Sequence, residues 1–272
     1  MNKIIFICLA LVLALMTNQS IFSQNIEAKS NKTISTHGHD EKLPLTAYNE
    51  HFEVFSEATP FVVGQPSNIL GHFTFLSNYK PLEKGSITIR MIVGDKEVKQ
   101  TLARPTRKGI YLFKLTPPAS GTAKIILNIT TPNQTSELII PNITVYTNTD
   151  DAQHAAISVL KGVSGGVVFI KEKSWKIDFA TDLVKKQSLN GKSMLTVPNE
   201  AIIDDNGESF VYIQITPEYF EKQLIKKGKS NNICTEILSG ISENQRIITK
   251  VTKLVKIEQA KIEEKAHVGH NH

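Results

Sequence analysis

The sequence predicts an all-β protein in which an N-terminal immunoglobulin-like β-sandwich is joined by a linker to a small C-terminal β domain. Apolar and polar residues alternate over residues 46–148, turn-forming glycine and proline recur between the alternating runs, and the same pattern returns over 193–252. Alternation with a period of two is typical of half-buried strands, and closely spaced turn residues are typical of antiparallel sandwiches. The contents of apolar residues (40%) and charged residues (21%) fit a globular chain.

The first domain is predicted strand by strand from this alternation. Residues 87–93 carry an apolar side chain at every second position, Gly94-Asp95 supplies a tight hairpin turn, and residues 96–102 return along the first strand. Residues 123–129 form a second alternating run. Because strands recur with no helical pattern between them, we expect one antiparallel sandwich over 46–148.

A connector is predicted over residues 149–192, and it carries the only tryptophan, Trp175. Asp150-Asp151 could open a short helix, which the glycines at positions 162, 165 and 166 would end. In the C-terminal domain (193–252), Asp204-Asp205-Asn206-Gly207 predicts a hairpin turn. The charged residues 253–272 are expected to form a helix-prone, histidine-containing tail.

The first 23 residues have the layout of a secretory signal peptide. Lys3 precedes an apolar run over residues 4–16, and a polar stretch then ends at Ser23. This run is shorter than the roughly 20 residues needed to cross a bilayer, so we expect cleavage near Ser23, export to the periplasm and a flexible lead-in over 24–45. Cys8 would leave with the signal peptide, and Cys234 then remains alone, in an apolar stretch that predicts a buried strand position.

Several functional classes find no support in the sequence. No nucleophile elbow, phosphate loop or dinucleotide fingerprint is present, so we expect neither an enzyme nor an organic cofactor. The formal net charge of +5 is mild, and its lysines are scattered, which argues against nucleic acid as a partner.

The distribution of histidines is the one sequence feature that indicates a specific chemistry, namely metal binding. Five of the eight histidines lie in the two polar ends. Neutral imidazole is a common ligand of transition metals, so we expect these residues to bind Zn, Co, Ni or Cu(II) transiently. The alternative is that they are merely tolerated polar residues, and His51, His72 and His154 are interpreted as ordinary surface or satisfied side chains. The candidate metal ligands are His37, His39, His267, His270 and His272.

Two blocks of the chain resemble the periplasmic adaptor (membrane fusion) subunits of resistance-nodulation-division heavy-metal efflux pumps. Residues 52–147 and the following Phe169–Thr181 are similar to the N-terminal β-domain of these adaptors and the segment after it. Val197-Pro198-Asn199-Glu200-Ala201-Ile202, Ile237-Leu238-Ser239-Gly240 and Arg246-Ile247-Ile248-Thr249-Lys250 resemble the membrane-proximal domain. The resemblance implies an inner-membrane efflux pump as partner, a location peripheral to the inner membrane, and a full-length adaptor as a further partner.

One departure from the family is large. Its members carry a lipoyl-like domain, an α-helical hairpin and a β-barrel between these blocks, whereas here only the polar linker Asp182–Lys192 joins them. Three hypotheses therefore stand. The chain is a truncated adaptor or accessory subunit that docks on a pump and binds divalent metal, a free-standing periplasmic metal-buffering protein, or a non-functional remnant of a full-length adaptor.

Overall fold

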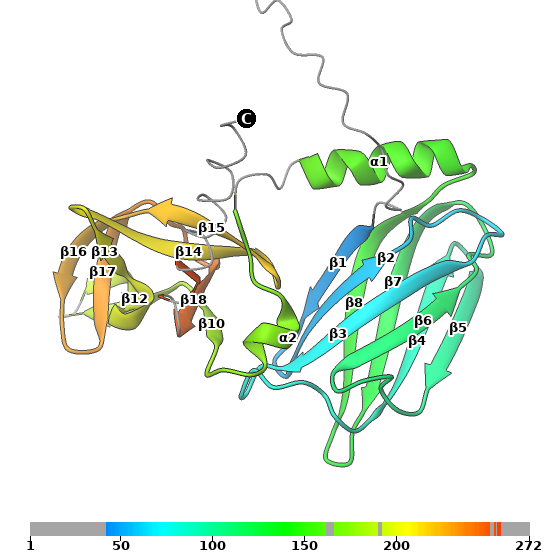
Figure 1. Ribbon diagram of the computed structural model, residues 1–272, viewed down its shortest axis with the longest axis horizontal. Helices are drawn as coiled ribbons and strands as arrows, with labels where there is room; N and C mark the ends of the chain where they lie inside the picture. Colours follow the sequence, from blue (N-terminus) through cyan, green and yellow to red (C-terminus); the bar gives the residue numbers. More distant parts are fainter. Residues whose placement is uncertain (1–41, 162–165, 190–191, 251–252, 254, 257–272) are drawn as a thin grey trace, which may run out of the picture. The chain divides into compact units, whose positions relative to one another are not determined.

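The computed structural model describes residues 42–161, 166–189, 192–250, 253 and 255–256. In these residues strands dominate and form four antiparallel sheets, so the predicted all-β fold is confirmed (Figure 1). Two sheets come from residues 43–145 and two from residues 167–250. Within the described part of the chain, no helix is both long and apolar enough to cross a membrane.

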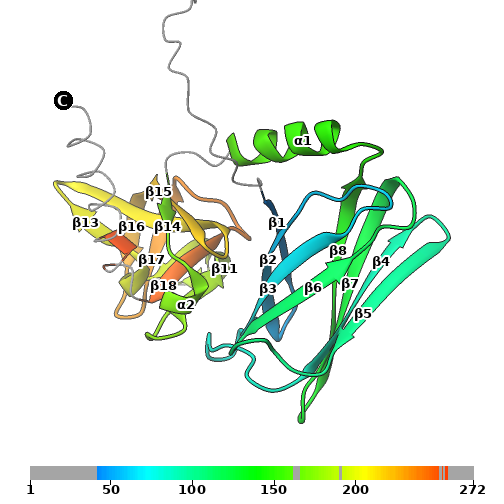
Figure 2. The same cartoon turned by 45° about the vertical axis from the view of Figure 1, so that its right-hand side comes forward.

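Two four-stranded sheets form the N-terminal sandwich, and they can be followed as separate layers in Figures 1 and 2. The first has the order β1-β2-β3-β6 and the second β5-β4-β7-β8. The strands are β1 (Leu43–Tyr48), β2 (Phe52–Ala58), β3 (Ser67–Phe75), β4 (Ser86–Val93), β5 (Lys96–Leu102), β6 (Ile110–Leu115), β7 (Gly121–Thr130) and β8 (Thr135–Val145).

A single apolar core lies between the two sheets of the sandwich. Phe73 and Phe113 from the first sheet and Met91 and Leu127 from the second belong to the same buried cluster. The alternation predicted for residues 87–93 is confirmed, because every second residue of β4 is buried. Met91 is fully buried in this core, so its sulfur is not accessible to a metal ion.

Both predicted hairpin turns are present. In the β4–β5 turn, Gly94 has a φ of 60°, which a residue with a Cβ adopts only with strain. In the second turn, Asn206 and Gly207 have φ values of 51° and 82°, as a two-residue turn of type I′ requires. This turn joins β13 (Ile203–Asp205) to β14 (Glu208–Thr216).

The C-terminal domain consists of a six-stranded and a four-stranded sheet. The first has the order β10-β18-β14-β15-β9 with β13 also paired to β14, and the second has the order β11-β12-β17-β16. The remaining strands are β9 (Val167–Val168), β10 (Ala180–Leu183), β11 (Lys185–Leu189), β12 (Lys192–Pro198), β15 (Tyr219–Leu224), β16 (Lys226–Ser230), β17 (Cys234–Ser239) and β18 (Arg246–Lys250).

Strand β14 is buried on both of its faces. Phe210 and Tyr212 belong to one apolar cluster of the domain, whereas Val211 and Ile213 belong to another. Successive side chains of a strand point to opposite faces, so apolar layers cover the six-stranded sheet on both sides. Cys234 is buried in β17, as predicted.

The predicted connector over 149–192 is wrong for its second half. Residues 167–168 and 180–189 form strands of the C-terminal sheets, and strands β10, β11 and β12 together take up most of the polar linker Asp182–Lys192. Sequence alternation missed β11 because it lies at a sheet edge, where lysines such as Lys185 and Lys186 stay exposed. The domain also continues past residue 252, since Val255 is fully buried in its core.

Helix α1 (Thr149–Lys161) occupies the first half of the predicted connector. The side-chain oxygen of Asn148 accepts a hydrogen bond from the Asp151 N–H at 2.9 Å, which caps the N-terminus of the helix. The short helix expected from Asp150-Asp151 is therefore present.

Candidate functional site

The five predicted metal ligands in the tails, His37, His39, His267, His270 and His272, lie outside the described residues. Metal binding by the tails therefore stays a prediction. Of the other three histidines, His51 and His154 are exposed, whereas His72 on β3 is buried and only 4% exposed. The polar cluster around His72 is the candidate site that the structure reveals.

This cluster lies where the sandwich meets the segment between strands β9 and β10 of the C-terminal domain. We call this set of contacts the junction. It joins β2 and β3 to the four-residue helix α2 (Lys171–Ser174) and to the β14–β15 turn, which contains Glu218.

A buried ion pair forms the centre of the junction. Lys171 Nζ donates to Glu53 Oε1, and the two side chains are only 1% and 0% exposed. Gln214 Nε2 on β14 donates to Glu53 Oε2 at 3.0 Å. A single buried charge without its partner costs several kcal/mol, so Glu53 and Lys171 each depend on the other.

Trp175 forms the second part of the junction. Its indole Nε1 donates to Thr74 Oγ1 at 2.9 Å, and its ring centroid lies 5.9 Å from that of His72. Lys80 Nζ donates to the Trp175 carbonyl oxygen at 2.9 Å. Gly109 has a φ of 75°, and a Cβ added there would lie 2.6 Å from Trp175 Cη2, so a glycine is needed beside the indole.

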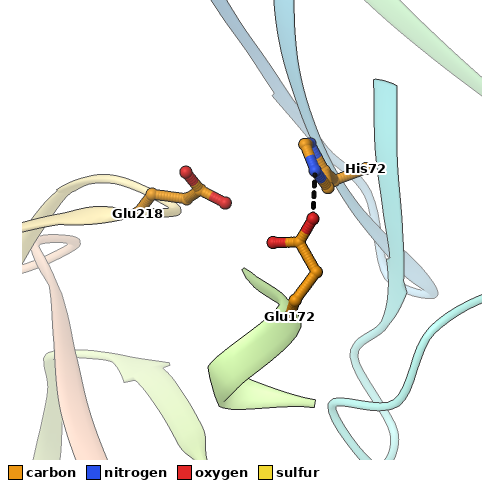
Figure 3. Close-up of side chains that lie close together, drawn as sticks. All are labelled: His72, Glu172 and Glu218. Atoms are coloured by element: carbon orange, nitrogen blue, oxygen red, sulfur yellow. Dashed lines mark hydrogen bonds and ion pairs between the residues drawn. The ribbon is translucent and has the colours of Figure 1, made fainter. Parts of the chain in front are cut away.

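The third part of the junction is a cluster of one histidine and two carboxylates (Figure 3). One potential ligand atom from each of His72, Glu172 and Glu218 lies within 4.8 Å of the others. His72 Nε2 and Glu172 Oε1 are 3.4 Å apart, and Glu218 Oε1 accepts the Lys171 N–H at 2.7 Å. Figure 3 shows the Glu218 carboxylate directed toward the space beside the other two side chains.

Burial sets the protonation states of this cluster. It lowers the pKa of His72, although Glu172 acts in the opposite direction, so the imidazole is neutral at pH 7. Burial raises the pKa of Glu218 to about 7, and the charges of Glu172 and Glu57 contribute to the increase. A neutral imidazole beside two carboxylates can hold a cation or share a proton.

The interpretation of His72 as an ordinary surface or satisfied residue was wrong. His72 Nδ1 is buried and has no hydrogen-bond partner. Sequence reasoning missed the cluster because its members are far apart along the chain: His72 and Glu172 are separated by 100 positions. The nearest signal was the resemblance itself, which covered both His72 and the Phe169–Thr181 segment but assigned neither a role.

The architecture defines a class: a β-sandwich followed by a small β domain in which the four-stranded sheet packs against one face of the six-stranded sheet, over strand β14. Residues 195–256 match the family model described as the CzcB C-terminal circularly permuted SH3-like domain. The resemblance to heavy-metal adaptors, or membrane fusion proteins, is thereby confirmed for this part of the chain, which contains an adaptor-type C-terminal domain.

The other comparisons add little. The chain is similar to a solved 180-residue stretch of SilB from Cupriavidus metallidurans CH34 that encompasses the N-terminal metal-binding site and the membrane proximal domain. The identity is 20% and the TM-score 0.25, over 43% of this chain and 57% of that chain, which is too weak to support an inference. No curated protein matches the chain.

Proposed function

We propose that this chain is a periplasmic adaptor-like accessory subunit of a heavy-metal cation efflux system. The match of residues 195–256 to an adaptor C-terminal domain carries the proposal. In this role the chain is exported, lies at the periplasmic side of the inner membrane, contacts an inner-membrane pump through its C-terminal domain and binds divalent metal through its histidine tails. It binds and docks, and it performs no catalysis.

Exposed apolar side chains on the C-terminal domain support the docking part of the proposal. Leu224, Ile233 and Leu238 are 49%, 78% and 54% exposed. A contiguous apolar patch on a surface is typical of contact with another protein, and these three side chains are our candidates for such a patch. Gly240 ends the Ile237-Leu238-Ser239-Gly240 motif and has a φ of 107°. A Cβ at this position would collide with the backbone of Leu224, so the glycine allows the end of this motif to lie close to the end of β15.

We expect the mature chain to be retained by the heavy-metal efflux pump encoded in the same genome, when that pump is immobilised in detergent at low salt. Replacing Leu238 by aspartate should weaken retention by at least about tenfold, because an apolar contact is lost and a charge is buried. Leu112→Asp is the matched control, since Leu112 is 50% exposed on the sandwich. Equal retention of both variants would contradict docking through the C-terminal domain.

Absence of any retention, even at low salt, would reject docking and would leave metal buffering or a non-functional remnant. The genomic neighbourhood separates these further. An adjacent pump gene without a full-length adaptor favours the accessory subunit, whereas an adjacent full-length adaptor favours the remnant.

We expect the tail histidines to contribute to metal uptake. Calorimetric titration of the mature chain with Zn²⁺ or Co²⁺ should show a lower stoichiometry after His267, His270 and His272 are replaced by alanine, because three imidazoles at this spacing can close around one ion. Asn271→Ala is the control, since it leaves all three imidazoles in place. An unchanged stoichiometry in the triple variant would show that the C-terminal tail binds no metal.

A further inference from the structure

We propose that His72, Glu172 and Glu218 form a binding site for one divalent transition-metal ion of the Zn²⁺ or Co²⁺ type within the junction. This site belongs to the folded part of the chain. It is separate from the tail histidines, and it does not depend on docking to a pump.

The geometry of the three side chains is close to that of a ligand set. Their ligand atoms lie within 4.8 Å of one another. Ligand atoms about 2.0–2.2 Å from a zinc ion lie roughly 3–4 Å apart, so small rotations of the two glutamate side chains would bring them into place. Glu172 is 42% exposed, which leaves room for water to complete the coordination sphere.

The incompletely satisfied imidazole of His72 is the second, independent observation, and Nε2 is its nitrogen that faces the Glu172 carboxylate. His72 Nδ1 is buried without a hydrogen-bond partner, and the Nε2 contact to Glu172 at 3.4 Å is longer than the usual range of about 2.7–3.2 Å. Buried polar atoms in folded proteins are nearly always satisfied, and an ion is one cause of an exception. Nε2, the nitrogen that faces Glu172, is the one placed to bind a metal ion.

The local charge also favours a cation. Glu172 and Glu57 act on both His72 and Glu218, whereas Lys171 is the one positive group that acts on both among the described residues. The Lys171 charge is already paired with Glu53. A divalent ion would therefore offset a surplus of carboxylates in a partly desolvated site.

The donor atoms point to the kind of ion. One imidazole nitrogen and two carboxylate oxygens suit Zn²⁺, Co²⁺ or Ni²⁺, whereas Cu(I) and Ag(I) prefer sulfur ligands. The described sulfur side chains lie elsewhere: Cys234 is in β17, and Met91 is in the core of the sandwich. The three ligands come from β3, α2 and the β14–β15 turn, so a bound ion would tie the sandwich to the C-terminal domain.

The test uses the full mature chain in which His37, His39, His267, His270 and His272 are all replaced by alanine. We expect calorimetry to show uptake of one equivalent of Zn²⁺, and Co²⁺ to give a visible absorption band that Zn²⁺ abolishes. In the same background, Glu172→Gln and Glu218→Gln should each weaken Zn²⁺ binding by at least about tenfold. The control Glu57→Gln removes a nearby exposed carboxylate outside the cluster and should leave the affinity within a few-fold.

Two results would overturn the proposal. One is the absence of Zn²⁺ uptake by the tail-substituted chain, which would assign all metal binding to the tails. The other is unchanged Zn²⁺ uptake in Glu172→Gln. Because Glu172 is partly exposed, this variant tests the site even if a variant of the more buried Glu218 fails to fold. Neither result bears on pump retention, so the site and the proposed function fail independently.

Discussion

Replacing Glu53 by alanine is expected to lower the free energy of unfolding by about 3–5 kcal/mol, because it leaves the ammonium of Lys171 buried without a counter-charge. Both side chains of this pair are almost completely buried, and Gln214 Nε2 also loses its acceptor. Urea unfolding checks this result by circular dichroism and by the fluorescence of Trp175, which lies in the same junction. A cost below about 1 kcal/mol would contradict a central role for the pair.

Two further variants separate the cause from a general loss of packing. Glu97→Ala breaks the ion pair with Arg90 on the sandwich surface and should leave the urea midpoint almost unchanged, because exposed pairs contribute little. The double variant Glu53→Leu, Lys171→Met replaces the buried pair with apolar side chains of similar size. It should recover much of the lost stability, since no unpaired charge remains.

Replacing Trp175 by alanine is the second large effect, with an expected loss of about 3–5 kcal/mol in the free energy of unfolding. The variant opens a cavity beside His72 and Gly109 and leaves Thr74 Oγ1 without its donor. Trp175 is the only tryptophan, so circular dichroism in urea is the appropriate measurement.

Trp175→Phe restores much of the apolar volume but not the hydrogen bond to Thr74, so its cost should be about 1–3 kcal/mol. Ile233→Ala serves as the control, because a side chain that is 78% exposed should change stability by no more than about 0.5 kcal/mol. A Trp175→Ala variant as stable as this control would mean that the indole does not hold the junction together.

The strands of the sandwich and both hairpin turns could be predicted because their signals are local. The alternation of residues 87–93 and the φ-permissive residues Gly94 and Gly207 act within a few positions of the chain. The short edge strand β11 carried no such signal, since it has no apolar face to bury, and its pairing with β12 is visible only in the structure.

The candidate metal ligands also include residues that the sequence pointed to and residues that only the structure revealed. The histidine tails were conspicuous because their composition is unusual, but their metal binding remains a prediction. His72 and Glu172 were inconspicuous, because one histidine in a strand and one glutamate in the charged run Lys171–Lys173 are common in any globular protein.

The sequence by itself determined the β architecture, the main turns and the adaptor-type character of the C-terminal domain, since the side-chain period of a strand and the conformational demands of a turn are local properties. Only the tertiary structure decided that Glu53 and Lys171 are buried together and that His72 meets Glu172 and Glu218. Desolvation and charge pairing depend on which distant segments pack against each other. The residues that define the junction therefore became recognisable only once the chain was folded.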